Sequence, residues 1–325
     1  MNEDTKRYLY DICVNHRDVL IVDVMNYLHR YYWTHQDLSV VIDDKVVQTG
    51  HLYGFTKFLL FLKDKFHDCS IVLAMDGMDK TRREINSEYK AGRSSSDNLY
   101  NSAENLFKMC SVLSNVYTCY DKDYEADDII NSVSNRIRDL CKRNNINKHI
   151  YILSNDKDMF QLVRDDNVSD IRIIRKFGTG KTWYSCADIV DEKKVEDTFE
   201  GVSPYDVLKF RAITGDPSDN LKGYYRFRKK DAAIIANNFD YNLENNELVL
   251  KKDVHPGYSW RRFLPKITEN MMLFKCNYEI MRLRTVDFEL ELLQKKYDYS
   301  EALSLINRYE LVTYMNAIES GNYSK

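Results

Sequence analysis

Two short runs of acidic residues carry the strongest chemical signal in the sequence. The first is YEADD, which holds Glu125, Asp127 and Asp128. The second is SNDKD, which holds Asp156 and Asp158. Carboxylates brought close together repel and raise each other's pKa, a cost that a divalent cation removes. Since neither run contains His or Cys, the oxygen-only donor set suits Mg²⁺ or Mn²⁺.

The elements that flank the two runs must bring them together. Apolar residues recur at helical spacing between the runs, at Ile130, Val133, Ile137 and Leu140. Residues 149–153 then read as a buried strand. The first run thus opens a helix and the second follows a strand. Because ligands in open α/β sheets collect at the carboxyl ends of strands, we expect the two sets of carboxylates to converge there.

Two further predicted strands end in an aspartate. Residues 18–24, DVLIVDV, hold Asp23, and residues 70–75, SIVLAM, precede Asp76. An acid at the end of an apolar strand is costly to bury unless it is paired or bound to a metal. A helix is expected over 50–66, so strands and helices alternate. This alternation predicts a parallel, doubly wound sheet.

The predicted fold class is α/β, with a mostly parallel central sheet flanked by helices. All four prolines lie beyond residue 200, which favours a change of architecture there. We expect an α/β core over 1–200 and a mainly α-helical region over 201–325. Residues 94–120 are polar at first and then helical, and we expect a mobile segment over the active centre.

Two smaller predictions concern structure without chemistry. A hairpin is expected at the sheet edge, with strands over 168–176 and 181–185. After residue 261 the sequence shows helical stripes, which we interpret as packing alone. The stripe residues are Met272, Cys276, Ile280, Leu303, Ile306 and Leu311.

A third acidic pair follows a predicted helix over 204–214. Asp216 and Asp219 are separated by Pro217 and Ser218, so a tight turn puts both carboxylates on one side. Asp121 and Asp123, in contrast, are interpreted as ordinary surface acids.

A basic segment, KTRREINSEYKAGR, follows Asp76. Its cations are candidate phosphate ligands and its tyrosine is a candidate base-stacking residue. The alternative is a solvated charged helix, and the neighbouring strand end makes phosphate binding the preferred hypothesis. The candidates are Arg82, Arg83, Tyr89, Lys90 and Arg93.

A second basic run precedes a helix that starts near Ala232. Basic residues at a helix N-terminus oppose the helix dipole unless an anion lies there. Plain surface charge explains this run equally well. Its residues are Arg226, Arg228, Lys229 and Lys230.

The composition agrees with a globular protein that handles a phosphate polymer. The 325 residues are 44% hydrophobic and 30% charged, without an apolar run long enough for a membrane helix. The seven cysteines form no CxxC pair, and the N-terminus lacks a signal-peptide layout, so we expect a cytoplasmic protein with reduced thiols. Nine of the 50 acids lie in the motifs above, which leaves 47 basic against 41 acidic residues elsewhere.

Taken together, these stretches resemble the 5′ nuclease family. That family includes flap endonucleases, the 5′ nuclease domain of bacterial DNA polymerase I, and phage 5′ exonuclease/ribonuclease H enzymes. The resemblance rests on five runs in the family's order: VLIVDVMNYLHR, IVLAMDGMDKTRREINSEYKAGR, YEADDII, SNDKDMFQLV and GDPSDNL. It implies a PIN-like nuclease domain with a helical arch at about 84–120, followed by a helix–hairpin–helix-like element.

The resemblance also implies a role for each acid. Two Mg²⁺ ions are expected, for which Mn²⁺ can substitute. The first ion's ligands would be Asp23, Asp76, Glu125, Asp127 and Asp156, and the second ion's would be Asp158, Asp216 and Asp219. Asp128 matches an acid behind these ligands, and we group it with Lys90 and Arg83 as catalytic.

The basic residues match the substrate-handling parts of the family. Arg83, Lys90 and Arg93 match the basic face of the arch, and Tyr89 matches a base-stacking position. One departure is clear, because the Gly-x-Gly turn that usually follows the last acidic pair is reduced to Gly223. This argues against a K⁺ site and favours the phage-type branch, with the second basic run holding duplex phosphates directly.

The resulting hypothesis is a metal-dependent 5′-3′ exonuclease and flap endonuclease. Its substrates would be nicked, flapped or 5′-ended duplex DNA and RNA–DNA hybrids, as in RNA primer removal. Two alternatives are a branched-DNA-binding protein that no longer cuts and a single-strand ribonuclease of the PIN type. A single-strand-binding protein or polymerase clamp is a partner that only the resemblance suggests, and a monomer is the default.

Overall fold

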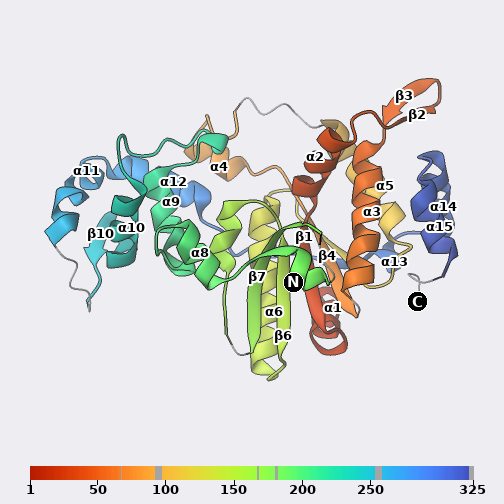
Figure 1. The fold of residues 1–325 in the computed structure, drawn as a ribbon, viewed down its shortest axis with the longest axis horizontal. Coiled ribbons are helices and arrows are strands. Elements are labelled where there is room, and N and C mark those ends of the chain that lie inside the picture. Colours follow the sequence, from red (N-terminus) through yellow and green to blue (C-terminus); the bar gives the residue numbers. More distant parts are fainter. Residues whose placement is uncertain (67, 92–96, 167, 180–181, 253–257, 322–325) are drawn as a thin grey trace.

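The computed structural model describes residues 1–66, 68–91, 97–166, 168–179, 182–252 and 258–321. A central sheet contains β1 (Asp18–Asp23), β4 (Cys69–Met75), β5 (Val116–Tyr120), β6 (Lys148–Leu153), β7 (Ser169–Phe177), β8 (Ala187–Val190) and β11 (Leu290–Leu292). The order across the sheet is β11-β5-β4-β1-β6-β7-β8 (Figure 1). The five inner strands are parallel, whereas β11 and β8 pair antiparallel at the edges. The predicted α/β class with a mostly parallel sheet is confirmed.

Strand β1 shows how the sequence builds this sheet. Its six residues are all buried, and successive side chains of a strand point to opposite faces. Val19 and Ile21 pack into one core cluster, and Leu20 and Val22 pack into the other. The sheet is therefore covered on both faces, as parallel sheets generally are.

Two groups of helices supply these covers. The first core cluster includes residues of α1 (Glu3–Asn15), α6 (Ala126–Arg143), α8 (Glu192–Thr198), α9 (Val207–Thr214), α10 (Lys229–Asn238), α11 (Leu264–Thr268) and α12 (Met271–Met281). The second includes residues of α2 (Val24–Thr34), α3 (Gly50–Lys65), α5 (Asp97–Cys110), α13 (Leu293–Lys296), α14 (Tyr299–Arg308) and α15 (Val312–Glu319).

Short elements connect these layers. Two hairpins are β2 (Ser39–Ile42) with β3 (Lys45–Gln48), and β9 (Phe239–Asn242) with β10 (Glu247–Leu250). The short helices are α4 (Lys80–Ile85) and α7 (Trp183–Cys186). The 3₁₀ helices are η1 (Lys157–Leu162), η2 (Pro204–Asp206), η3 (Pro217–Asp219) and η4 (Tyr258–Arg262).

The segment over 94–120 differs from its prediction. Helix α5 ends at Cys110, and β5 is an inner strand between β4 and β11. The apolar stripe of Leu106, Met109 and Leu113 is buried in the core. The helical prediction is therefore confirmed for α5 and wrong for β5, and the burial of the stripe does not favour a mobile segment there. Residues 92–96 lie outside the described residues.

The predicted edge hairpin exists, but its second strand is displaced. Strands β7 and β8 pair antiparallel at the sheet edge. The returning strand is Ala187–Val190 instead of 181–185, because residues 183–186 form α7 first. The backbone N–H of Gly178 donates to the carbonyl of Cys186 at 2.7 Å, which closes this wider loop.

The C-terminal chain returns to the α/β core, and the division near residue 200 stays a prediction. After α12, β11 pairs with β5, and α14 and α15 pack beside α5 and α3 (Figure 1). The stripe prediction is confirmed for Ile280, which is buried. It is wrong for Met272, which is 69% exposed on the solvent side of α12.

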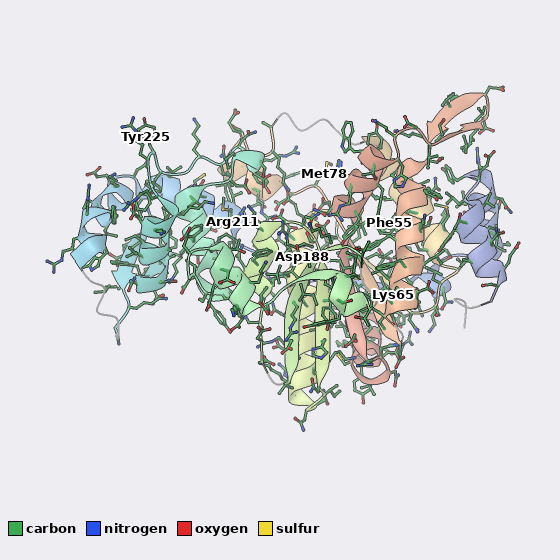
Figure 2. The ribbon with its side chains drawn as sticks, viewed as in Figure 1. Phe55, Lys65, Met78, Asp188, Arg211 and Tyr225 are labelled. Carbon is green, nitrogen blue, oxygen red and sulfur yellow. The ribbon has the colours of Figure 1, made fainter. Side chains whose placement is uncertain are left out.

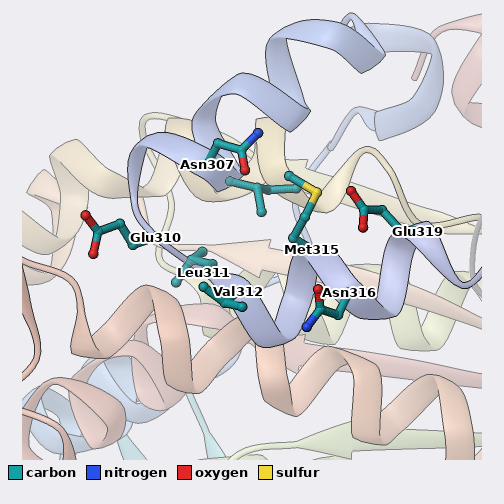
Figure 3. Close-up of a pocket in the computed structure, with 8 residues that line it drawn as sticks. Asn307, Glu310, Leu311, Val312, Met315, Asn316 and Glu319 are labelled. Atoms are coloured by element: carbon teal, nitrogen blue, oxygen red, sulfur yellow. The ribbon is translucent and has the colours of Figure 1, made fainter.

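Neither of two surface pockets coincides with the acidic candidates. One, of about 320 Å³, lies between α14 and α15 and is lined by Leu311, Val312 and Met315 among others (Figure 3). The other, of about 630 Å³, is lined by residues of η2, α9 and β9. The candidate site is therefore marked by its charged side chains and not by a pocket. Across the described residues, we find no helix with the length and apolar character needed to cross a membrane.

Candidate active site

Three aspartates gather at one edge of the central sheet. Asp23 ends β1, Asp76 follows β4, and Asp156 lies just beyond β6. Since β4, β1 and β6 are parallel neighbours, their carboxyl ends meet at the same edge. Asp23 interacts electrostatically with both other acids. The predicted convergence of acids from separate strands is confirmed.

Asp23 is held in a buried position that disfavours its charge. The residue is 6% exposed, and its carboxylate accepts hydrogen bonds from the Asn26 amide (3.1 Å) and the Ser154 hydroxyl (2.8 Å). Burial, followed by the nearby charge of Asp76, raises the pKa of Asp23 to about 7. The surroundings of Asp23 at the end of β1 thus disfavour its ionised, negatively charged form.

Helix α6 brings two more acids to this edge. The amide of Ala126 donates to the Asp76 carboxylate at 2.7 Å, which fixes the start of α6 against the end of β4. Glu125 is the N-cap residue and Asp127 lies in the first turn. Burial and then the charge of Asp156 raise the pKa of Asp127 well above its usual value.

Glu125 differs from Asp127 because three donors surround it. Its carboxylate accepts from Arg82 (2.7 Å), Lys90 (2.9 Å) and the Tyr89 hydroxyl (3.1 Å). Burial opposes ionisation, but Lys90 and Arg82 outweigh it and lower the pKa of Glu125. Glu125 is therefore a carboxylate whose charge is already balanced.

Asp128, also in the first turn of α6, is 0% exposed. Arg82 donates to it at 2.9 Å, and Arg284 donates through both its amide (2.8 Å) and its Nε (3.0 Å). A carboxylate enclosed in this way has no open face for a substrate, which does not favour the predicted catalytic role of Asp128.

A second acidic cluster lies around a buried arginine on α9. Arg211 is 5% exposed, and it contacts Asp158 at 2.6 Å and Asp216 at 2.5 Å. Burial raises the pKa of Asp158 to about 7 despite Arg211. For Asp216, the Ser218 hydrogen bond and Arg211 overcome burial and lower the pKa. Asp219, 7% exposed, ends η3 beside them.

The carboxylate oxygens of these acids suit divalent cations, although the described side chains are not arranged around a common ion position. In the part of the chain that the structure describes, no three His, Cys, Asp or Glu side chains form a ready metal site. The carboxylates instead accept hydrogen bonds from nearby amides and hydroxyls. The raised pKa values of Asp23 and Asp127 come partly from neighbouring carboxylates, and a hard cation would relieve this repulsion.

The first basic segment divides into buried and exposed parts. Arg83 is exposed and Lys90 is half-buried, so both remain candidates for phosphate contact. Arg82, 2% exposed, is enclosed by Glu125 and Asp128, a position that does not favour its predicted role in binding nucleic acid. Tyr89, 6% exposed, has its ring in the core, so its base-stacking role stays a prediction that this burial does not favour. Arg93 lies outside the described residues.

The second basic run is exposed at the start of α10. Arg226, Lys229 and Lys230 are exposed, and neighbouring Tyr225, which is 80% exposed, projects from the surface (Figure 2). Arg228 instead makes two 2.8 Å hydrogen bonds to Asp231. Asp231 lies in the first turn of α10, so it balances part of the charge that the sequence left unexplained.

Two arginines of the candidate site were not predicted from the sequence. Arg211 lies in a helix that we expected only to pack, and Arg284 lies in the segment interpreted as free of chemistry. The one available signal was a charged residue within a run of apolar neighbours, as in FRAIT for Arg211. Such a residue must find a buried partner.

Comparisons with known proteins agree with this architecture. The family model of the 5′-3′ exonuclease N-terminal resolvase-like domain matches residues 18–200. A 5′-3′ exonuclease of Buchnera aphidicola subsp. Schizaphis graminum is 28% identical over 232 residues, covering 70% of this chain and 72% of that protein. Another, from Buchnera aphidicola subsp. Acyrthosiphon pisum, is 26% identical and covers 91% and 98%.

A solved structure shows the same fold along nearly the whole chain. It is a bacteriophage T5 flap endonuclease in a pseudo-enzyme-product complex with DNA and metal ions, with a TM-score of 0.56 and 15% identity. The match covers 94% of this chain and 99% of that one. Because the family model spans more than half of the chain, the protein belongs to the 5′-3′ exonuclease family.

Proposed function

We propose that the protein is a metal-dependent 5′-3′ exonuclease and flap endonuclease that hydrolyses phosphodiester bonds in DNA and in RNA–DNA hybrids. The observation that carries this proposal is the cluster of Asp23, Asp76, Asp127 and Asp156 at the strand ends, with raised pKa values at three of them. The half-buried cation of Lys90 stands beside the cluster. Such a site attracts divalent cations and the phosphates that bind them.

The acids of the two clusters would hold two Mg²⁺ ions. Asp23, Asp76, Asp127 and Asp156, with Glu125, would hold the first, and Asp158, Asp216 and Asp219 the second. When bound, such a pair supplies an activated water and stabilises the leaving oxygen. Manganese has the same preference for oxygen ligands and would substitute.

The chain's own cations would position the phosphodiester. Lys90 reaches Glu125 through its Nζ at 2.9 Å and has a left-handed backbone at φ 53°. The contact with Glu125 places the ammonium beside the acidic edge, where it would contact a non-bridging phosphate oxygen. Exposed Arg83 would hold the neighbouring phosphate.

The cellular role that we propose is removal of RNA primers and 5′ flaps during phage-type DNA replication, in the cytoplasm of a bacterial or phage-infected cell. The reduced Gly-x-Gly turn and the likeness to the T5 fold support the phage-type assignment. Ribonuclease H activity on hybrids is part of the same proposal.

A 5′-labelled flap on nicked duplex DNA tests the proposal. Wild-type protein is incubated with Mg²⁺ or EDTA beside Asp156→Asn and the control Asp123→Asn, which changes an exposed acid near the site. We expect short labelled products with Mg²⁺ from wild type and Asp123→Asn, and none with EDTA or from Asp156→Asn. The length of the products separates exonuclease from flap cutting, and a labelled RNA–DNA hybrid tests the ribonuclease H activity.

Two other outcomes would replace this function. A bound but intact flap in every lane would indicate a branched-DNA-binding protein that does not cut. Equal cutting of unstructured RNA and flapped DNA would indicate a single-strand ribonuclease. Wild-type rates from Asp156→Asn would refute the site assignment.

A further inference from the structure

The start of α6 is held by a buried charge network that reaches far along the chain. Asp79 and Asp128 supply two negative charges, and Arg82 and Arg284 supply two positive charges. Asp79, Arg82 and Asp128 are at most 5% exposed, and the Arg284 side chain is 19% exposed. The four charges balance, so losing any one leaves an unpaired buried charge.

Arg284 is the member that comes from outside the family module of residues 18–200. It lies between α12 and β11 and docks along α6 through several contacts. Its amide and guanidinium donate to Asp128, its carbonyl accepts from Asn131 at 2.9 Å, and its guanidinium stacks on Tyr124 at 5.5 Å. Two residues on, the amide of Val286 donates to the Ser132 hydroxyl at 2.8 Å.

These contacts end at the residues that would bind metal. Tyr124 precedes Glu125, and Asp128 follows Asp127. Arg284 therefore contacts the residues on both sides of the two candidate ligands, Glu125 and Asp127. Arg82 connects the same network to the carboxylate of Glu125 at 2.7 Å. Because Arg284 also donates to Asp128, Arg82 can donate one N–H group to Asp128 and another to Glu125.

We propose that Arg284 is a positioning residue for the metal-binding carboxylates. Through Asp128 and Arg82 it fixes the first turn of α6 and therefore the directions of Glu125 and Asp127. This inference rests on the proposed function, and it adds that the segment after α12 completes the site. Residues that orient the ligands of a metal typically affect metal affinity without touching the metal.

Two substitutions of Arg284 test this role. Arg284→Met keeps the aliphatic length but removes the charge and the donors, and Arg284→Lys restores the charge without the guanidinium fork. The matched control is Arg282→Met, in the same segment, whose half-exposed side chain pairs with Glu279 at 2.9 Å. Mn²⁺ binding to the DNA-free protein is measured by titration, and flap DNA affinity is measured separately in EDTA.

For Arg284→Met we expect Mn²⁺ affinity to fall about 10-fold or more, with DNA affinity in EDTA unchanged. Arg284→Lys should recover part of the Mn²⁺ affinity, and Arg282→Met should match wild type. An unchanged Mn²⁺ isotherm in folded Arg284→Met would overturn the inference. If Arg284→Met does not fold, the double variant Arg284→Met/Asp128→Asn removes both charges and the same comparison applies to it.

The failure of this inference is distinguishable from the failure of the proposed function. If wild-type protein neither binds Mn²⁺ nor cuts the flap, the proposed function fails. If wild type does both and Arg284→Met binds Mn²⁺ equally well, only the role of Arg284 fails.

Discussion

Individual acids in this site differ in how their charges are balanced. Glu125 faces Arg82 and Lys90, and Asp128 faces Arg82 and Arg284. Asp23 and Asp127, in contrast, interact strongly with other carboxylates. The first pair stabilises the fold in the absence of metal, whereas the second pair costs stability until a cation is present.

Removing the charge of Asp127 should therefore stabilise the metal-free protein. A folded pKa raised above the unfolded value means that ionisation at neutral pH destabilises the native state. We expect Asp127→Asn to increase the free energy of unfolding in EDTA by on the order of 1 kcal/mol. Urea denaturation measures this change, and the exposed-site variant Asp123→Asn is the control.

Added Mg²⁺ should reverse the ranking. A ligand present at 100 times its Kd stabilises the native state by about 2.7 kcal/mol, and wild type should show a gain of this order. Asp127→Asn should gain much less. An equal Mg²⁺ response in the two proteins would show that Asp127 does not bind the ion.

The buried position of Tyr89 leads to a different expectation at this scale. Its hydroxyl donates to Glu125 at 3.1 Å from a buried ring. Tyr89→Phe should cost about 1 kcal/mol of stability and leave DNA affinity in EDTA unchanged. Tyr10→Phe, which alters a tyrosine that is 57% exposed, is the control. A loss of DNA affinity with unchanged stability would restore the base-stacking role.

Among the elements, α6 and the strands that position the acids were predictable from sequence. Their patterns are local: DVLIVD is apolar throughout, and α6 repeats its apolar residues at helical spacing. Strand β5 was missed because VYTCY is short and follows the apolar stripe of α5. The sequence pattern alone does not show that β4 and β11 enclose it.

The two site arginines were missed for a related reason. Arg211 pairs with nearby Asp216 but also with Asp158, which is distant in the sequence, and Arg284 pairs with equally distant Asp128. A lone Arg in a helix or loop gives no local sign of its partner. Only the packing of α9 and of the segment after α12 against the sheet edge reveals these pairs.

The packing of α3 against α5 should make stability depend on pH. His51 on α3 is 4% exposed and its Nε2 lies 2.9 Å from the Ser102 hydroxyl on α5. Burial lowers the pKa of His51 from 6.5 to about 4. The unfolded chain then binds more protons than the native state between these values, so stability falls as the pH drops from 6.5 to about 4.

The His51→Gln variant isolates this contribution. Relative to that variant, wild type should lose about 2–3 kcal/mol across this pH window. Urea denaturation of both proteins at several pH values gives the difference. Parallel stability curves for the two proteins would show that His51 titrates normally.

Across the whole molecule, the net charge of −3 hides a separation of charge. The candidate metal ligands gather near the strand ends, while exposed cations lie on α4 and at the start of α10. A protein with this distribution binds DNA through phosphate contacts despite its negative total. The strength of binding should then fall steeply with salt.

The salt dependence also distinguishes free cations from paired ones. Each phosphate contact contributes a slope of about 0.9 to log affinity against log salt. Lys229→Ala and Lys230→Ala should each reduce the slope by about that amount, because both side chains are exposed. Arg228→Ala should reduce it less, because Asp231 already holds its guanidinium through two 2.8 Å bonds. The measurement is duplex binding by fluorescence anisotropy in EDTA over a series of salt concentrations. Equal slopes for Arg228→Ala and Lys230→Ala would mean that DNA displaces Asp231 and recruits the whole basic run.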